Sequence, residues 1–186
     1  MQSLKKELLI VFKKNKSGGG FTLLEVITAI FILTVGGGAA FNLIQQTLAS
    51  SSLIKERLIA SYLAQEGMEL VKNLRDTAWL KAKTEPTISW DEYLPAGDWQ
   101  ADYSTQGLNQ VYDDNSYLNI DANGFYSYSS GTSTKFKRKI SISEKTDLDG
   151  DDKPDKMKAS VTVSWQERGR THNLEVLEYL TNWYEK

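Results

Sequence analysis

Four aspartates in the segment DLDGDDKPD have the spacing of a calcium-binding loop. They are Asp147, Asp149, Asp151 and Asp155, at positions 1, 3, 5 and 9 of the segment. Carboxylate oxygens at such intervals converge on Ca²⁺ in tight loops. The segment departs from the EF-hand, because its glycine is fourth rather than sixth and Lys158 stands where a bidentate glutamate would be. The sequence predicts a weak calcium site and no other cofactor, with a solvated Asp-Gly turn as the alternative.

A single carboxylate, Glu25, lies in the most apolar part of the chain. It is the only ionisable side chain among the 24 residues from Phe21 to Ile44, which are enough to span a bilayer as a helix. A charge at bilayer depth costs on the order of 3 kcal/mol, so a partner is expected. Glu25 lies one helical turn after Phe21, whose α-ammonium would become free if the chain were cut after Gly20. Glu25 could pair with that ammonium, with the ammonium of a neighbouring parallel subunit, or snorkel to the membrane surface.

The segment before this apolar run is basic and ends in small residues. The first 20 residues contain five lysines and one glutamate, a net charge of +4, which leaves −6 on the rest of a chain whose total is −2. Such a charge distribution predicts a cytoplasmic N-terminus and a head across the membrane. The small residues 17–20 precede the apolar run, whereas an ordinary secretory signal has its cleavage site after that run. The sequence therefore predicts a cut that leaves the apolar helix on the mature protein.

The string GFTLLEV, residues 20–26, closely resembles the class III signal of type IV prepilins and pseudopilins. In that family, a basic leader ends in glycine, phenylalanine follows, and glutamate is fifth in the mature chain. The resemblance implies that a prepilin peptidase removes residues 1–20 by cutting after Gly20 and N-methylates Phe21, and that Glu25 acts in assembly. It also implies a structural protein rather than an enzyme.

The resemblance further implies partners and a location. The partners are the prepilin peptidase, other pilin subunits, and a pilus or secretion assembly platform. The protein is expected in the cytoplasmic membrane, with a single pass, and afterwards in an extracellular pilus or pseudopilus. The most similar class is the PilV-type minor pilins, because the segment 64–76 also resembles their helix. A pseudopilin of a type II secretion or competence system and a membrane-tethered surface-binding module are the alternatives.

One long helix, from about Thr22 to Thr77, is the simplest account of the first half of the chain. Its assembly part is predicted at 21–44 and its amphipathic part at 45–80. Glycines 36–38 predict either local bending or close packing between helices. Apolar residues at intervals of three and four predict a stripe that packs on a sheet. These residues are Leu53, Ile54, Leu58, Tyr62, Met68, Val71 and Leu74, and polar residues such as Glu56 lie between them.

A β-rich head is predicted at 81–186. It begins with an ordered irregular connection to about Asn115, and the sequence DANG predicts the turn of a hairpin. Alternation predicts that Ala159, Val161, Val163 and Trp165 face the helix. The fold class is thus α+β, a pilin-like lollipop with a long N-terminal helix packed on an antiparallel sheet of about four strands. The predicted strands are Tyr117–Ile120, Phe125–Tyr128, Lys135–Ser143, Met157–Trp165 and Asn173–Leu180.

Three other features have a functional and an ordinary interpretation. The run KFKRK at 135–139 could contact phosphates, but nucleic acid is an unlikely partner for an acidic head, and a half-exposed strand has the same pattern. The aromatic residues suggest sugar binding if they are exposed and a core if they lie under the helix. His172 has no cysteine or recognisable nucleophile motif to act with, and the absence of cysteine excludes disulfides and thiol chemistry.

Overall fold

The computed structural model describes residues 20–150 and 153–182. The contacts divide the chain into two compact units, Met1–Ala49 and Ser50–Lys186, which are considered separately. The helix α2, Leu23–Ala82, supplies residues to both. Its first turn is capped by the hydroxyl oxygen of Thr22, which accepts a hydrogen bond from the amide of Glu25 at 3.2 Å. Its end is closed at Lys81, whose carbonyl accepts hydrogen bonds from the amides of Thr84 and Glu85. The predicted long helix is confirmed and continues a little beyond its predicted end.

In the first unit, every residue from Gly20 to Leu48 is exposed. The helix runs through Gly36, Gly37 and Gly38 without interruption, so the structure shows none of the local melting that these glycines could permit. A Cβ added at any of the three would meet no other atom within 4 Å. The three consecutive glycines therefore leave more than half the circumference of one helical turn without side chains, and another helix can approach closely there.

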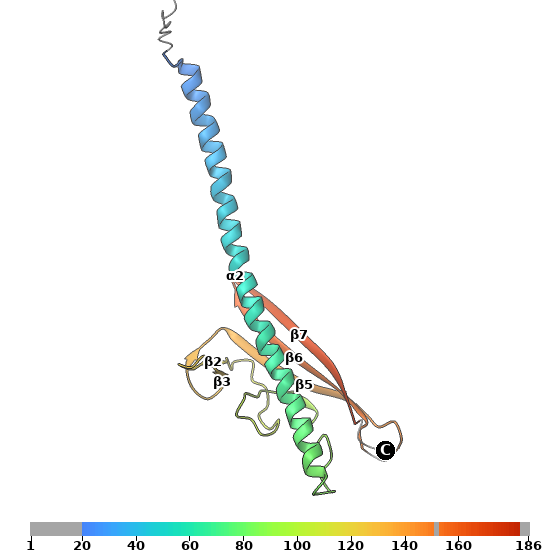
Figure 1. Ribbon diagram of the computed structural model, residues 1–186. Helices are drawn as coiled ribbons and strands as arrows, with labels where there is room; N and C mark the ends of the chain where they lie inside the picture. Colours follow the sequence, from blue (N-terminus) through green and yellow to red (C-terminus); the bar gives the residue numbers. More distant parts are fainter. Residues whose placement is uncertain (1–19, 151–152, 183–186) are drawn as a thin grey trace, which may run out of the picture. The chain divides into compact units, whose positions relative to one another are not determined.

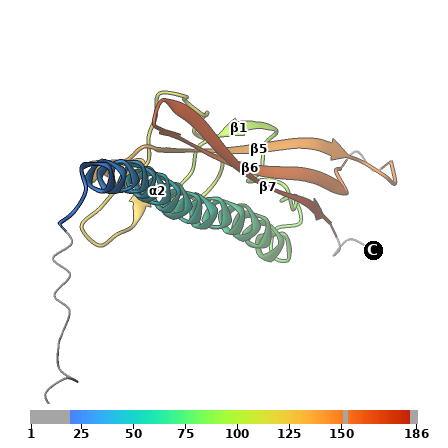
Figure 2. The ribbon, with the colours of Figure 1, turned by 90° about the horizontal axis from the view of Figure 1, so that it is seen from above.

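In the second unit, one face of α2 packs against a sheet (Figure 2). The predicted stripe is correct for Met68, Val71 and Leu74, which are buried, and wrong for three residues at its start, Ile54, Leu58 and Tyr62, which are exposed. The buried face is set instead by small residues that let the sheet approach closely. They are Ala60, Ala64, Gly67 and Ala78. At Gly67, an added Cβ would lie 2.8 Å from a methyl carbon of Val161 on the sheet, so the contact leaves no room for a side chain.

The main sheet has four antiparallel strands in the order β1-β5-β6-β7 (Figure 2). Their bounds are β1 Gly97–Trp99, β5 Phe136–Thr146, β6 Lys156–Glu167 and β7 Arg170–Thr181. The three long strands were predicted and form a meander. The strand β1 was missed, since it is three residues long and lies in the segment that was predicted as irregular. Arg168 and Gly169, both with positive φ, form the two-residue turn between β6 and β7.

The predicted DANG hairpin is confirmed, but it belongs to a separate small sheet of order β3-β2-β4 (Figure 1). Its strands are β2 Asn119–Ile120, β3 Tyr126–Ser127 and β4 Thr132–Ser133. The main sheet therefore reaches four strands through β1 and not through this hairpin. The fold class α+β is confirmed.

The core of the second unit lies between α2 and the main sheet. The face of β6 predicted to meet the helix is buried at all four positions, Ala159, Val161, Val163 and Trp165. The irregular connection is ordered, because it fills the rest of the core with Trp90, Leu94 and Leu108. The indole N–H of Trp90 donates a hydrogen bond to the carbonyl of Pro154 at 2.6 Å, which joins this connection to the start of β6.

Candidate functional site

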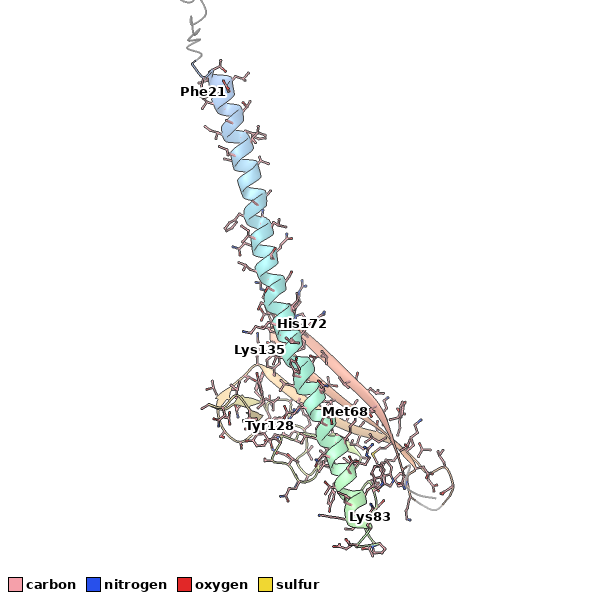
Figure 3. The ribbon with its side chains drawn as sticks, viewed as in Figure 1. Phe21, Met68, Lys83, Tyr128, Lys135 and His172 are labelled. Atoms are coloured by element: carbon pink, nitrogen blue, oxygen red, sulfur yellow. The ribbon has the colours of Figure 1, made fainter. Side chains whose placement is uncertain are left out.

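Gly20 and Phe21 precede the first turn of α2, and Figure 3 shows Phe21 at the start of the helix. Both residues are exposed, so the peptide bond between them lies outside the helix and is accessible. An added Cβ at Gly20 would meet no atom within 4 Å. The fold therefore does not require glycine at this position. The rest of the predicted leader, residues 1–19, lies outside the described residues.

Glu25 lies in the first turn of α2, where the helix dipole favours negative charge. Its backbone amide and carbonyl bond to the hydroxyls of Thr22 and Thr28. Within residues 20–150 and 153–182, its carboxylate has neither a hydrogen bond nor an ion pair. Glu25 is thus a charge without a partner in the described chain, and it lies on an otherwise apolar surface.

That apolar surface is extensive. Fourteen large apolar side chains between Phe21 and Leu48 are exposed. Among the described residues, α2 is the one helix long and apolar enough to cross a membrane, by length and composition. The fourteen are Phe21, Leu23, Leu24, Val26, Ile27, Ile30, Phe31, Ile32, Leu33, Val35, Phe41, Leu43, Ile44 and Leu48.

The second unit contains a buried guanidinium that was not predicted. Arg138 is 0% exposed and lies on the inner face of β5 between Phe136 and Ile140. It donates hydrogen bonds to the carbonyl of Leu63 on α2 at 3.1 Å and to the carbonyl of Ala101 at 2.6 Å. Alternation along KFKRK puts Arg138 on the same face as Phe136, and this is the signal in the sequence that could have indicated its burial. This residue joins the helix, the sheet and the irregular connection.

Lysines of the KFKRK run are paired with carboxylates. Lys135, labelled in Figure 3 beside α2, bonds to the carboxylates of Glu56 on α2 and Glu167 on β6, the latter at 2.8 Å. Glu56 was predicted on the polar face of the helix but is buried, because Lys135 reaches across to it. Burial alone would lower the pKa of Lys135, but its hydrogen bonds to the two carboxylates raise it above the ordinary value. This cluster is a link between helix and sheet.

The other two lysines of the run are also engaged. Lys137 lies 3.4 Å from the carboxylate of Asp114, and Lys139 lies 3.4 Å from that of Asp98. A phosphate would therefore have to compete with a carboxylate for each of them, which disfavours a nucleic-acid interface on this strand.

Three of the predicted calcium ligands come together in the connection between β5 and β6. Asp147, Asp149 and Asp155 each offer a carboxylate oxygen, and these oxygens lie within 4.8 Å of one another. Asp151 lies outside the described residues. Oxygen donors at this separation suit Ca²⁺. The same carboxylates also close the turn, because Asp147 accepts a hydrogen bond from the amide of Gly150 at 2.6 Å. The calcium site stays a prediction.

The aromatic residues are divided between the core and the surface, so the core interpretation is correct for some of them and sugar binding stays a prediction. Trp90, Phe136 and Trp165 are buried in the core, whereas Tyr103 and Phe125 are exposed. His172 stacks on Trp165, with ring centroids 5.4 Å apart, which is a packing role.

Comparison with known proteins identifies the N-terminal segment. Residues 15–41 match the family described as the prokaryotic N-terminal methylation motif. Neither the curated proteins nor the solved structures contain a match to this chain. The matched range includes Gly20, Phe21 and Glu25, and the chain carries a type IV pilin-like class III signal. Proteins with this motif are structural, and the motif together with the apolar helix fits a membrane-anchored protein.

Proposed function

We propose that this chain is a structural subunit of a type IV pilus, of the minor-pilin class. A prepilin peptidase cuts it after Gly20 and N-methylates Phe21. The apolar helix holds the subunit in the cytoplasmic membrane, with the N-terminus on the cytoplasmic side. An assembly platform then moves the subunit into a filament, in which the same helix packs against other pilin subunits and the head is exposed outside the cell.

The observation that carries this proposal is the wholly exposed apolar surface of residues 21–48. Removing one large apolar side chain from water is favourable by about 1.5–3 kcal/mol, so fourteen of them on one exposed segment cannot be stable in water. Lipid can cover this surface before assembly, and neighbouring helices can cover it afterwards. The turn without side chains at Gly36–Gly38 suits the second environment, because helix backbones approach most closely where side chains are absent.

The lone charge at Glu25 fits the same proposal. In a cut chain, the α-ammonium of Phe21 is one helical turn away, and an ion pair between them would offset the cost of placing Glu25 in lipid. In a filament of parallel helices, the ammonium of a neighbouring subunit is an equivalent partner. Such an intersubunit pair would fix how far one helix is displaced along the next.

A pseudopilin of a type II secretion or competence system is the first alternative, because it would share every N-terminal feature. A membrane-tethered surface-binding module is the second, and the exposed aromatic residues of the head favour it as an added role. The two assembly roles are distinguished by where the processed subunit is found, in surface pili or in a short periplasm-spanning pseudopilus.

The test is co-expression of the full chain with a prepilin peptidase and mass spectrometry of the product. The wild type should lose residues 1–20 and gain a methyl group on Phe21. Gly20→Ala should remain uncut although its fold is unchanged. Glu25→Ala should be cut but should not enter filaments, whereas Glu69→Ala, an exposed glutamate on the same helix, should be cut and incorporated. An uncut wild-type chain would overturn the proposal.

A further inference from the structure

Four exposed basic side chains gather at one end of the second unit. Lys55 and Arg57 belong to α2, and Arg168 and Arg170 flank Gly169 in the turn between β6 and β7. We refer to these four residues as the basic end. They stand out because the chain from Phe21 onward is acidic, with a net charge of −6.

The β6–β7 turn is fastened to α2 by charged contacts (Figure 1). The carboxylate of Glu167, at the end of β6, accepts a hydrogen bond from the hydroxyl of Ser52 at 3.4 Å and one from the ammonium of Lys135 at 2.8 Å. The same ammonium bonds to the carboxylate of Glu56. These contacts place the turn beside the helix residues 52–56.

The same contacts bring the basic end together. Arg168 follows Glu167 directly, and Arg170 is the partner of Glu167 in the register of β6 and β7. Lys55 and Arg57 are the two neighbours of the buried glutamate on α2. Successive residues of a helix are about 100° apart, so these two side chains leave the helix on either side of the face that the sheet covers. The basic end therefore surrounds the point where α2 enters the head.

The positive charge of the basic end is not neutralised within the head. The acids of this cluster, Glu56 and Glu167, are both bonded to Lys135. Arg168 comes within only 4.0 Å of the Glu167 carboxylate, and its side chain is 64% exposed. The other three side chains of the basic end have no hydrogen bond or ion pair within residues 20–150 and 153–182. Five basic and two acidic side chains leave this cluster a surplus of three positive charges.

The basic end follows directly on the apolar segment of α2. The last of the fourteen exposed apolar residues is Leu48. Ser52, beside the β6–β7 turn, is four residues further along the helix, a rise of about 6 Å, and Lys55 is seven residues further, a rise of about 10 Å. The headgroup layer extends about 5–7 Å beyond the hydrocarbon on each side of a bilayer. Charges in water are screened over about 8 Å at physiological salt, so the basic end acts on lipid headgroups from this distance.

The chemistry of the basic end matches an anionic headgroup. Guanidinium groups bind phosphate oxygens through paired hydrogen bonds, and the basic end offers two of them in one turn. Each lysine or arginine close to an anionic membrane surface adds to the attraction. Ile54, next to Lys55, is 67% exposed, and a basic surface that also bears apolar side chains is typical of membrane interfaces. An acidic protein surface fits less well, because it would offer Ile54 no apolar contact.

We propose that the basic end binds the headgroups of anionic phospholipids in the leaflet that the head faces. The proposal rests on the membrane anchoring proposed above and adds a second contact between the subunit and the membrane. The apolar helix holds the subunit in the bilayer, and the basic end holds the head against the surface. Both contacts are broken when the subunit leaves the membrane.

The test is hydrogen–deuterium exchange of the full chain in nanodiscs of phosphatidylcholine alone, or of equal parts of phosphatidylcholine and phosphatidylglycerol. In the wild type, the peptide that covers residues 166–171 should exchange about threefold more slowly, or slower still, in the anionic discs, and high salt should remove the difference. The double variant Lys55→Gln/Arg57→Gln lies outside that peptide and should also remove the difference. Lys81→Gln/Lys83→Gln removes two exposed lysines at the other end of the helix and should keep it. Equal exchange of the three proteins in neutral discs shows that the fold is unchanged.

Several results would overturn the proposal. These are equal exchange in the two kinds of disc, slowing that survives Lys55→Gln/Arg57→Gln, and slowing that Lys81→Gln/Lys83→Gln removes as well. Slowing in assembled filaments but not in anionic discs would also overturn it and assign the basic end to a neighbouring subunit. A chain that does not enter neutral discs would overturn the proposed anchoring together with this proposal, whereas equal exchange in a chain that does enter them overturns this proposal alone.

Discussion

Replacing Arg138 with methionine is expected to destabilise the head strongly. Methionine retains much of the apolar stem of the arginine but removes the guanidinium. That group is fully buried and donates hydrogen bonds to the carbonyls of Leu63 and Ala101. It also lies 3.4 Å from the carboxylate of Glu66, which is 36% exposed, so solvent weakens this ion pair.

The expected loss follows from these contacts. A hydrogen bond from a charged donor contributes about 1.5–3 kcal/mol, so two of them contribute about 3–6 kcal/mol. Part of this gain is offset in the native protein, because Nε of Arg138 is buried without a partner among the described residues and the guanidinium is desolvated. We therefore expect Arg138→Met to lower the free energy of unfolding of the head by about 2–4 kcal/mol.

The assay is urea denaturation of the full chain in detergent, followed by the fluorescence of the buried tryptophans Trp90 and Trp165. Lys139→Met is the matched control, because Lys139 is the next residue of β5 but lies on the outer face, with one carboxylate at 3.4 Å. The control should lose less than about 1 kcal/mol. Equal losses in the two variants would refute the conclusion that Arg138 joins helix, sheet and connection.

Three further predictions concern the head. Gly67→Ala should destabilise it by up to about 2 kcal/mol in the same urea assay. The reason is that overpacking against Val161 outweighs the gain in helix propensity. A stabilised variant would contradict the close contact between α2 and the sheet. Burial alone would raise the pKa of Asp91, but the hydrogen bonds from Lys145, at 2.7 Å, and Ser89 lower it below 3.8. The stability that this carboxylate contributes is therefore present above pH 3.8 and is lost as the pH falls through the lowered pKa. In Asp91→Asn, the urea midpoint should therefore change less with pH between pH 5 and pH 2 than it does in the wild type. Isothermal titration calorimetry with CaCl₂ should show binding with a Kd on the order of 10⁻⁴–10⁻³ M. Asp155→Asn should abolish this binding. Equal heats from the wild type and the variant would contradict the calcium prediction.

The parts of the structure that follow from local sequence were predictable. The long helix and the strands β5, β6 and β7 repeat their apolar residues over many turns or pleats, so the type of each element was clear, and so was the buried face of β6. The class III signal was predictable for another reason, since Gly20, Phe21 and Glu25 lie within six consecutive residues and need no fold to bring them together. The strands β1 and β4 have three and two residues, which is too short for any periodicity to appear.

The parts that depend on contacts between distant segments were not predictable. Exposed Ile54, Leu58 and Tyr62 continue the apolar repeat of α2, and the repeat does not show where the sheet begins to cover the helix. The burial of Glu56 depends on Lys135, which directly precedes β5 and is distant from Glu56 in the sequence. Tyr103 and Phe125 touch because two separate turns place them side by side, and neither turn contains a sign of the other.

The measurement that tests the central claim most directly is mass spectrometry of the N-terminal peptide of this chain recovered from sheared and purified surface filaments. The account predicts a peptide that begins at Phe21 and carries one N-methyl group, and its loss from the filament fraction in the Glu25→Ala strain. Recovery of the chain from membranes alone, with residues 1–20 still attached, would contradict it.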